Sequence, residues 1–177
     1  DYLISLKHIL GQDRPFLNHE TGELFIGAFM THRAIEKSSI VQRNYPIIHD
    51  AIKNIGSVQI RNVATIGGNL VNAVPSADGA IPLIALDAKA HIYGTKGHRS
   101  QELLRFFLGP GQCDLTSGEI LLEIVIPPLQ PRTGGAYIKH GRREAMELPM
   151  LGVGVLLSME EDLKTCAKAR ICLGVAA

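Results

Sequence analysis

Residues 59–78 constrain the fold of this chain more than any other stretch, because they place two adjacent glycines and several polar side chains in an otherwise apolar run. Gly67 and Gly68 have no Cβ atom, and glycine adopts positive φ angles at no steric cost. Successive backbone N–H groups in such a turn can converge on an anion. Thr65 or Asn69 would then orient the bound group. We therefore predict a phosphate-binding turn at the two glycines.

The residues after Gly68 are predicted to begin a helix. A helix N-terminus presents unpaired N–H donors and the positive end of the helix dipole, so a pyrophosphate group would fit there. The alternative is a tight turn between two buried elements, since a glycine pair is first of all a turn signal. The residues by themselves leave both interpretations open.

Length and composition indicate one or two ordinary globular domains. The chain has 177 residues, of which 46% are hydrophobic and 20% charged, which is enough for a sizeable core. Its formal net charge of +1 lacks the basic footprint that nucleic-acid binding needs. No apolar run approaches the roughly 20 residues that span a bilayer, and the first residues form no basic leader. We therefore expect a cytoplasmic protein that binds neither nucleic acid nor membrane.

The cysteines and histidines suggest no metal site and no catalytic side chain. Cys113, Cys166 and Cys172 match no zinc or iron–sulfur ligand spacing. A disulfide between Cys166 and Cys172 would need two paired strands, and an odd cysteine count without a signal sequence favours reduced thiols. The histidines are scattered, and no spacing indicates a catalytic triad or a pair of acid and base carboxylates.

Apolar periodicity predicts a series of strands and helices in the first half of the chain. Residues 2–6 and 24–28 are predicted to be strands. Thr31 is predicted to cap a short helix, and Pro46 to open a second helix whose apolar stripe ends at Gly56.

The next segments continue the alternation of helix and strand. Ser76 or Asp78 is predicted to cap a helix through residues 83–86. A strand at 90–93 and a helical turn at 103–107 follow. This order favours an α/β arrangement of layers.

The pattern changes from Glu119 onward. Strands joined by short turns are predicted at residues 120–126, 136–140, 151–159 and 167–175. Prolines and glycines in residues 127–135 resemble a linker and predict a domain boundary. The second part is therefore expected to be an antiparallel meander.

Taken as a whole, residues 59–78 resemble the T-x-G-G-N signature of the FAD-binding subunits of molybdenum hydroxylases, the family that includes xanthine dehydrogenase and the medium subunit of carbon monoxide dehydrogenase. Residues 51–62 look like the helix and turn that lead into this signature. Residues 72–88 are similar to its N-A-x-P-x-x-D and A-L-D-A pattern. Residues 106–111 and 119–127 resemble its F-F-x-G-P-G and E-I-L-x-x-I-x-I-P segments. So many ordered blocks at compatible spacing are hard to obtain by chance.

The resemblance implies an α+β fold in two parts. Residues 1–128 would form the second α/β subdomain of an FAD-binding half, with a first glycine-rich loop missing. Residues 135–177 would begin a C-terminal flavoprotein domain as an antiparallel three-stranded sheet that lacks its helical cap. We therefore expect a piece, truncated at both ends, of a subunit of roughly 280 to 300 residues.

The resemblance also implies a cofactor site. The residues expected to approach the pyrophosphate of FAD are Ala64, Thr65, Gly67, Gly68 and Asn69. Asn72 and Asp78 would contact the ribityl or ribose hydroxyls, and Leu122 and Lys139 the adenine or flavin. Three of these residues also have an ordinary structural explanation. Asp78 could be a simple helix cap, Leu122 a core residue and Lys139 a solvated strand residue.

Two places depart from the pattern of the family. Glu147-Leu148-Pro149 replaces the Asp-Ile-Ala that follows a basic turn in many relatives. Ile55 stands where several relatives carry an aromatic residue against the isoalloxazine ring.

The implied function is electron transfer in a heteromeric complex. The intact subunit would take electrons from an iron–sulfur partner and pass them to an external acceptor, while another partner carries the molybdopterin and the organic substrate. Without one phosphate loop the chain would lose about half of the charge-assisted donors to the pyrophosphate, so we expect little bound FAD. The alternative is a non-catalytic docking module that no longer binds FAD. A general nucleotide-binding domain is disfavoured, because G-K-[ST] and G-x-G-x-x-G are absent.

Overall fold

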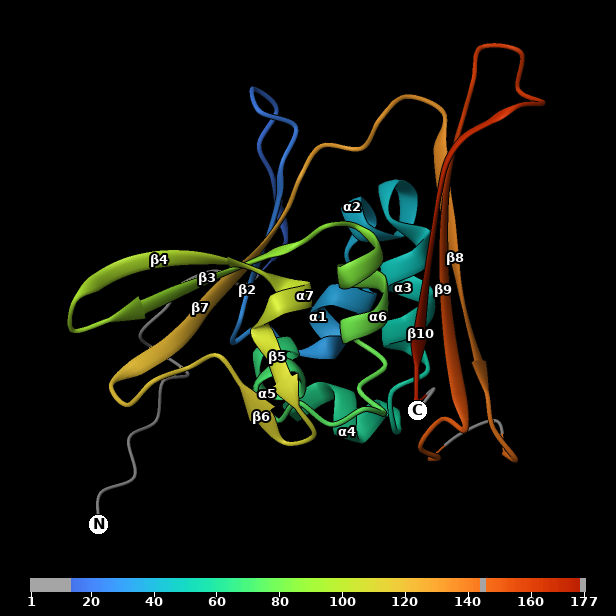
Figure 1. The fold of residues 1–177 in the computed structure, drawn as a ribbon. Helices are drawn as coiled ribbons and strands as arrows, with labels where there is room; N and C mark the ends of the chain where they lie inside the picture. The colour runs from blue at the N-terminus through green and yellow to red at the C-terminus, as the bar shows by residue number, and fades with distance from the viewer. Residues whose placement is uncertain (1–13, 144–145, 176–177) are drawn as a thin grey trace.

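Two antiparallel sheets enclose a layer of helices. The structure is a computed structural model that describes residues 14–143 and 146–175. One sheet has five strands in the order β1-β2-β7-β3-β4, and the other has three in the order β10-β9-β8. Figure 1 shows the helices between the five-stranded sheet on the left and the three-stranded sheet on the right.

The strands and helices have the following bounds. The five-stranded sheet contains β1 (Phe16–Leu17), β2 (Leu24–Gly27), β3 (Lys89–Gly94), β4 (Gly97–Glu102) and β7 (Glu119–Ile126). The three-stranded sheet contains β8 (Thr133–His140), β9 (Leu151–Met159) and β10 (Cys166–Gly174). A small hairpin is made of β5 (Phe107–Gly109) and β6 (Gln112–Cys113). The helices are α1 (His32–Glu36), α2 (Ser39–Asn44), α3 (Pro46–Lys53), α4 (Val58–Val63), α5 (Ile66–Val71), α6 (Ala80–Ala85) and α7 (Leu103–Phe106).

Hydroxyl side chains begin four of these short helices. Each one accepts a hydrogen bond from the backbone N–H three residues further on, which satisfies one of the free donors of a helix start. The pairs are Thr31 with Ala34 (3.2 Å), Ser38 with Val41 (3.5 Å), Ser57 with Ile60 (3.3 Å) and Thr65 with Gly68 (3.1 Å). Pro46 occupies the first turn of α3, where its missing N–H costs nothing.

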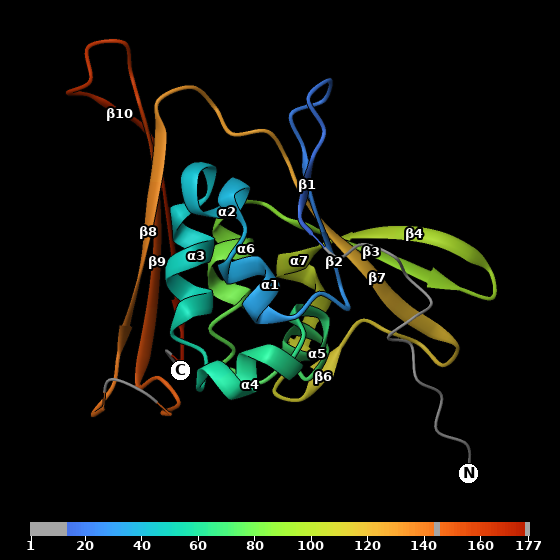
Figure 2. The same cartoon turned by 180° about the vertical axis from the view of Figure 1, so that it is seen from behind.

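The helical layer and both sheets share one hydrophobic core. The buried face of α3 consists of Ile47, Ile48, Ala51 and Ile52, none of which is more than 1% exposed. This helix packs on β8 and β9, and Figure 2 shows it alongside β8. Tyr137 and Leu156 of the three-stranded sheet belong to the same cluster of buried residues as the inner face of the other sheet.

Glycines on the inner face of the three-stranded sheet bring it close to α6. A Cβ atom added at Gly152 or Gly154 would lie 2.6 Å or 2.9 Å from the side chain of Ile81. A Cβ atom at Gly174 would also collide with Ile81. The three glycines therefore form a socket for this side chain, which is 3% exposed.

The structure confirms the predicted α+β fold and its antiparallel three-stranded sheet. The helix capped by Thr31, the helix opened by Pro46 and the strand at 90–93 are also confirmed. The helix α2 was not predicted. The predicted strand at 2–6 lies outside the described residues, and the division into parts 1–128 and 135–177 stays a prediction.

Two local predictions are settled by these elements. The prediction that Ser76 or Asp78 caps the helix before residue 86 is wrong, because α6 follows Gly79 and has no side-chain cap. Cys166 and Cys172 lie on the same strand, β10, and the three cysteines are free.

Among the described residues no helix has the length and apolar character needed to cross a membrane.

The glycine socket generates a prediction about stability. Ile81→Ala should lower the free energy of unfolding by about 2 to 5 kcal/mol, because the glycines around it cannot fill the resulting cavity. Ile138→Ala is the control, since Ile138 is 68% exposed, and it should change stability by less than about 0.5 kcal/mol. Urea unfolding of both variants tests this, and equal midpoints for the two would contradict the packing described.

Candidate cofactor site

The two glycines of the predicted phosphate turn lie inside a helix. Thr65 is the N-cap of α5, which begins at Ile66, so Gly67 and Gly68 occupy the first turn of the helix. Neither glycine has a positive φ angle. The predicted glycine turn and the alternative of a tight turn are therefore wrong. The predicted helix is present, but it begins at Ile66, before the glycines, and not after Gly68.

The N–H groups at the start of α5 are already bonded within the protein. Their acceptors are the carbonyl of Met30 for Ile66 (3.0 Å), the carbonyl of Ala28 for Gly67 (2.8 Å), Oγ1 of Thr65 for Gly68 (3.1 Å) and the carbonyl of Thr65 for Asn69 (3.1 Å). The predicted cradle of free amides is therefore wrong. The physical reason is that the chain leaving β2 supplies carbonyl acceptors at the helix start, which removes the cost of unpaired donors.

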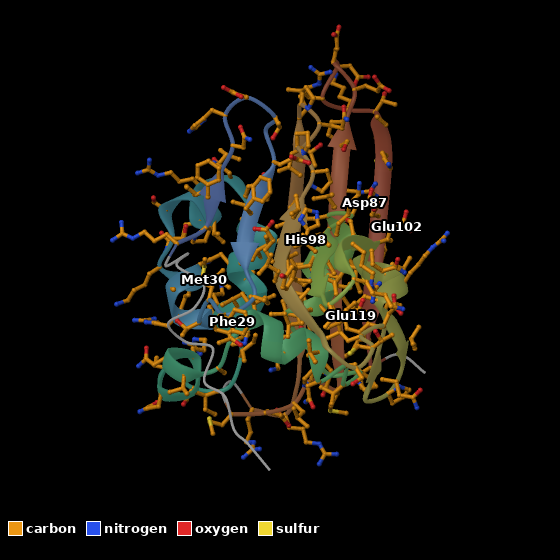
Figure 3. The ribbon with its side chains drawn as sticks, turned by 90° about the vertical axis from the view of Figure 1, so that its left-hand side faces the viewer. Phe29, Met30, Asp87, His98, Glu102 and Glu119 are labelled. Atoms are coloured by element: carbon orange, nitrogen blue, oxygen red, sulfur yellow. The ribbon has the colours of Figure 1, made fainter. Side chains whose placement is uncertain are left out.

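Gly67 is required by this close contact. A Cβ atom at Gly67 would lie 2.6 Å from the carbonyl oxygen of Ala28. The N–H of Ala28 donates in turn to the carbonyl of Leu122 (2.9 Å). Two predicted site residues, Gly67 and Leu122, are thus joined through Ala28. Phe29 and Met30, which follow Ala28, lie close to each other beyond the end of β2 (Figure 3).

The segment after Ala28 also pairs with the residues before α5. Thr31 and Thr65 form an antiparallel bridge, so the caps of α1 and α5 lie side by side. The N–H of His32 donates to the carbonyl of Ala64 (2.9 Å). Ala64, Thr65 and Leu122 are therefore held around the start of α5 by backbone bonds.

Gly68 has no comparable reason to be glycine. It is exposed, and a Cβ atom there would meet only Oγ1 of Thr65, at 3.2 Å. Glycine in a helix costs roughly 0.5 to 1 kcal/mol relative to alanine. The fold does not demand this cost. A glycine at such a position suits the close approach of a bound group to the backbone.

Asn69 connects this region to the next part of the predicted site. Its Oδ1 atom is buried without a hydrogen-bond partner. A Cβ atom at Gly79 would lie 2.6 Å from that oxygen, so the carboxamide lies against the backbone just before α6. Asn72, by contrast, is an exposed residue that caps the other end of α5.

Asp78 and Lys139 form a buried ion pair. Asp78 is 5% exposed, and its Oδ2 accepts from Nζ of Lys139 at 2.9 Å. The same Nζ donates to the carbonyl of Asn54 at 3.1 Å. The alternatives of Asp78 as a helix cap and Lys139 as a solvated strand residue are therefore wrong, since the Lys139 side chain is only 12% exposed.

Tyr137 completes this pair and was not identified from the sequence. Its hydroxyl donates to Oδ1 of Asp78 at 2.5 Å, and burial together with this bond and the charge of Asp78 raises the pKa of the phenol. The signal was available, because residues two apart on a strand share a face and Lys139 was a predicted site residue.

The structure therefore gathers the predicted residues into two adjoining groups. One group surrounds the start of α5 and includes Leu122, which is half-buried. The other group is Asp78 with Lys139. They meet where Asn69 touches Gly79, the neighbour of Asp78, and Asn72 stands apart at the far end of α5. Within residues 14–143 and 146–175 no group of three or more His, Cys, Asp or Glu side chains could hold a metal.

A solved structure with the same fold comes from a molybdenum enzyme. Carbon monoxide dehydrogenase from Hydrogenophaga pseudoflava, in a form that lacks the Mo-pyranopterin moiety of the molybdenum cofactor, matches with a TM-score of 0.83 and 30% sequence identity. The match covers 90% of this chain and 54% of the other. The class of the fold is therefore that of an α+β chain of such a dehydrogenase.

The family follows from the sequence itself. The chain belongs to the family of FAD binding domains in molybdopterin dehydrogenases, whose model matches residues 1–129. It is similar to the xanthine dehydrogenase FAD-binding subunit of Escherichia coli O157:H7, with 36% identity over 96% of this chain. It is also similar to the carbon monoxide dehydrogenase medium chain of Hydrogenophaga pseudoflava, with 31% identity over 98% of this chain. The chain spans 58% of the length of both relatives.

The contact between Gly67 and Ala28 generates a second prediction. Gly67→Ala should lower the free energy of unfolding by about 1 to 3 kcal/mol. The added Cβ atom would collide with the carbonyl oxygen and the Cβ atom of Ala28, and neither of these can rotate away. Gly68→Ala is the matched control on the same helix and should lose clearly less stability than Gly67→Ala, because its Cβ atom would meet only Oγ1 of Thr65, at 3.2 Å. Thermal unfolding of both variants measures this. A Gly67→Ala protein with unchanged stability would show that the contact is not as close as described.

A third prediction concerns acid sensitivity at the first residue of α1. The ring of His32 is 1% exposed and its Nδ1 has no partner. Burial, and secondarily the charge of Arg61, lowers the pKa of His32 from 6.5 to about 4. Because the unfolded state then binds the proton more tightly, the stability that the neutral ring provides is complete above pH 6.5 and is lost as the pH falls towards 4.

This loss should amount to about 2 kcal/mol between pH 7.5 and pH 5. His32→Gln cannot titrate and should remove that part of the pH dependence, whereas His98→Gln on the surface should keep it. Urea unfolding at the two pH values tests the assignment. The assignment fails if His32→Gln loses as much stability on acidification as the original protein.

Proposed function

We propose that this chain is the FAD-binding part of an electron-transfer subunit in a molybdenum-containing hydroxylase or dehydrogenase. The family match and the names of the two relatives support this proposal. The subunit receives electrons from an iron–sulfur partner subunit and passes them to an external acceptor. A further partner subunit carries the molybdopterin and acts on the organic substrate, and the complex is cytoplasmic.

The observation that carries the proposal is the exposed glycine in the first turn of α5. Gly68 is exposed, a Cβ atom there would meet only Oγ1 of Thr65, at 3.2 Å, and Asn69 follows it in the helix. The site fits a phosphate-bearing cofactor, because a missing side chain beside polar groups permits close approach. The Oδ1 atom of Asn69 is buried without a hydrogen-bond partner, and we assign the Nδ2 atom of this side chain to the cofactor.

In this proposal side chains, and not free backbone amides, bind the pyrophosphate. Thr65 and Asn69 bind the pyrophosphate through their side chains, and Ala64, Gly67 and Gly68 supply a backbone surface that has no bulky groups. Thr65 Oγ1 accepts from Gly68 and retains its own proton for donation. Asn72 and Asp78 bind hydroxyls of the cofactor.

Leu122 and Lys139 contribute on the flavin or adenine side. Leu122 packs against the cofactor, and Lys139 contributes an ammonium group that is paired with the carboxylate of Asp78. FAD, when bound, supplies the redox chemistry, and the protein orients it and influences its potential through nearby charge.

The proposed arrangement also concerns the second part of the chain. Residues 1–128 form the FAD-binding part and residues 135–177 begin a second domain, whose sheet receives a helical cap in the whole protein. The outer face of that sheet fits such a layer, since Ile138, Ile171 and Leu173 on it are 68%, 69% and 53% exposed.

A variant of Gly68 tests the proposal. Gly68→Ala should reduce the affinity of the intact subunit for FAD by at least about tenfold, because the added methyl group occupies the surface that the cofactor approaches. The variant should remain folded, because the added Cβ atom would meet only Oγ1 of Thr65, at 3.2 Å. Gly134→Ala is the control, because a Cβ atom there meets nothing within 4 Å and the residue lies on β8 away from α5. Quenching of flavin fluorescence in a titration measures the affinity.

Two results would go against the proposal. If the Gly68→Ala variant binds FAD as tightly as the original protein, α5 is not part of the cofactor site. A subunit that binds no FAD at all would favour the alternative of a non-catalytic docking module.

A further inference from the structure

A buried arginine links α4 to α1 and to the turn that follows α3. Arg61 lies on α4, and its side chain is 9% exposed. Its Nε donates to Oε2 of Glu36 on α1 at 2.9 Å. Its Nη1 donates to the carbonyl of Ile55 at 2.8 Å, just beyond the end of α3. One guanidinium therefore fixes the relative positions of α1, α4 and the turn at residues 54–56.

The turn at residues 54–56 is held from its other side by Lys139. Nζ of Lys139 donates to the carbonyl of Asn54, and Arg61 donates to the next carbonyl, that of Ile55. Two cations thus hold consecutive peptide groups. Gly56 completes the turn with a φ of +50°, a conformation that side chains rarely adopt.

Glu36 holds the side chain of Arg61 in place. Partial burial opposes ionisation of Glu36, but hydrogen bonds from Arg61 and Arg33 outweigh it and lower the pKa of the carboxyl. Arg33 forms its own ion pair with Glu36 at 2.9 Å. Arg33 is therefore a partner of the same carboxylate, but its hydrogen bonds do not reach the turn.

Stability alone does not account for this arrangement. A buried ion pair often contributes little to folding relative to an apolar replacement, because desolvation offsets the attraction. A guanidinium with donors in a fixed planar geometry, however, sets the direction of the groups that it binds. The contacts of Arg61 therefore specify the shape of the turn more than they stabilise the fold.

We propose that Arg61 is a positioning residue for the cofactor site. By holding the carbonyl of Ile55, Arg61 keeps the neighbouring carbonyl of Asn54 in reach of Lys139, and thereby keeps the Lys139–Asp78 pair in one geometry. Arg61 itself does not touch the cofactor. This inference rests on the proposed function, because Lys139 and Asp78 are its cofactor-binding residues.

The test compares Arg61→Gln and Arg61→Lys with Arg33→Gln in the intact subunit. Flavin affinity, the visible absorbance spectrum of the bound flavin and its midpoint potential are measured, together with the melting temperature. Arg61→Gln should weaken FAD binding by about tenfold or more and shift the spectrum or the potential. Arg61→Lys should not restore them, because one ammonium cannot donate to both Glu36 and Ile55 with the geometry of a guanidinium. Arg33→Gln should leave the flavin properties unchanged.

Amide hydrogen exchange of the FAD-free subunit provides a second measurement. Exchange at the amides of residues 54–57 should accelerate in Arg61→Lys and stay unchanged in Arg33→Gln. This measurement keeps the inference testable if Arg61→Gln unfolds.

Different outcomes separate the inference from the proposed function. An original subunit that binds no FAD defeats the proposed function. If the original subunit binds FAD and both Arg61 variants match it in affinity, spectrum and potential, only the positioning role is overturned. An equal effect of Arg33→Gln also overturns it, because the role would then belong to the charge of Glu36 and not to the contact with the turn.

Discussion

The close approach of Gly67 to Ala28 is the contact on which the rest of the structure depends. The absence of a Cβ atom lets the first turn of α5 lie on the chain that leaves β2, and the N–H of Gly67 donates to the carbonyl of Ala28. Ala28 is in turn bonded to Leu122 of β7. The start of α5, the end of β2, strand β7 and the cap of α1 therefore lie together. The residues predicted to bind the pyrophosphate lie around this contact.

The second sheet contributes to the same region through buried charge. Tyr137 and Lys139 reach from β8 to Asp78, which lies two residues before the start of α6. A buried carboxylate is tolerated only when its partners replace water, and here a phenol and an ammonium both do so. The candidate site is therefore assembled from both sheets and the helices between them. The glycine socket for Ile81 contributes to the site because it keeps the three-stranded sheet close to α6.

Local signals in the sequence predicted much of the fold and only part of the site. Hydroxyl caps, Pro46 and the alternation of apolar residues depend on neighbours in the chain, so the helices at 31 and 46 and the three-stranded sheet could be predicted. The conformation of Gly67 could not, because it depends on Ala28, which is far away in the sequence. Asp78 likewise looked like a helix cap, since nothing near it in the chain reveals Tyr137. The family resemblance proposed which residues form the cofactor site, but it did not predict how the structure arranges them.

The most direct test is a crystal structure of the intact subunit with FAD bound. The account predicts that the pyrophosphate lies over Gly68 within hydrogen-bonding distance of the side chains of Thr65 or Asn69, while the amides of Ile66 and Gly67 keep their bonds to Met30 and Ala28. A pyrophosphate bound away from α5, with Gly68 facing solvent, would contradict it.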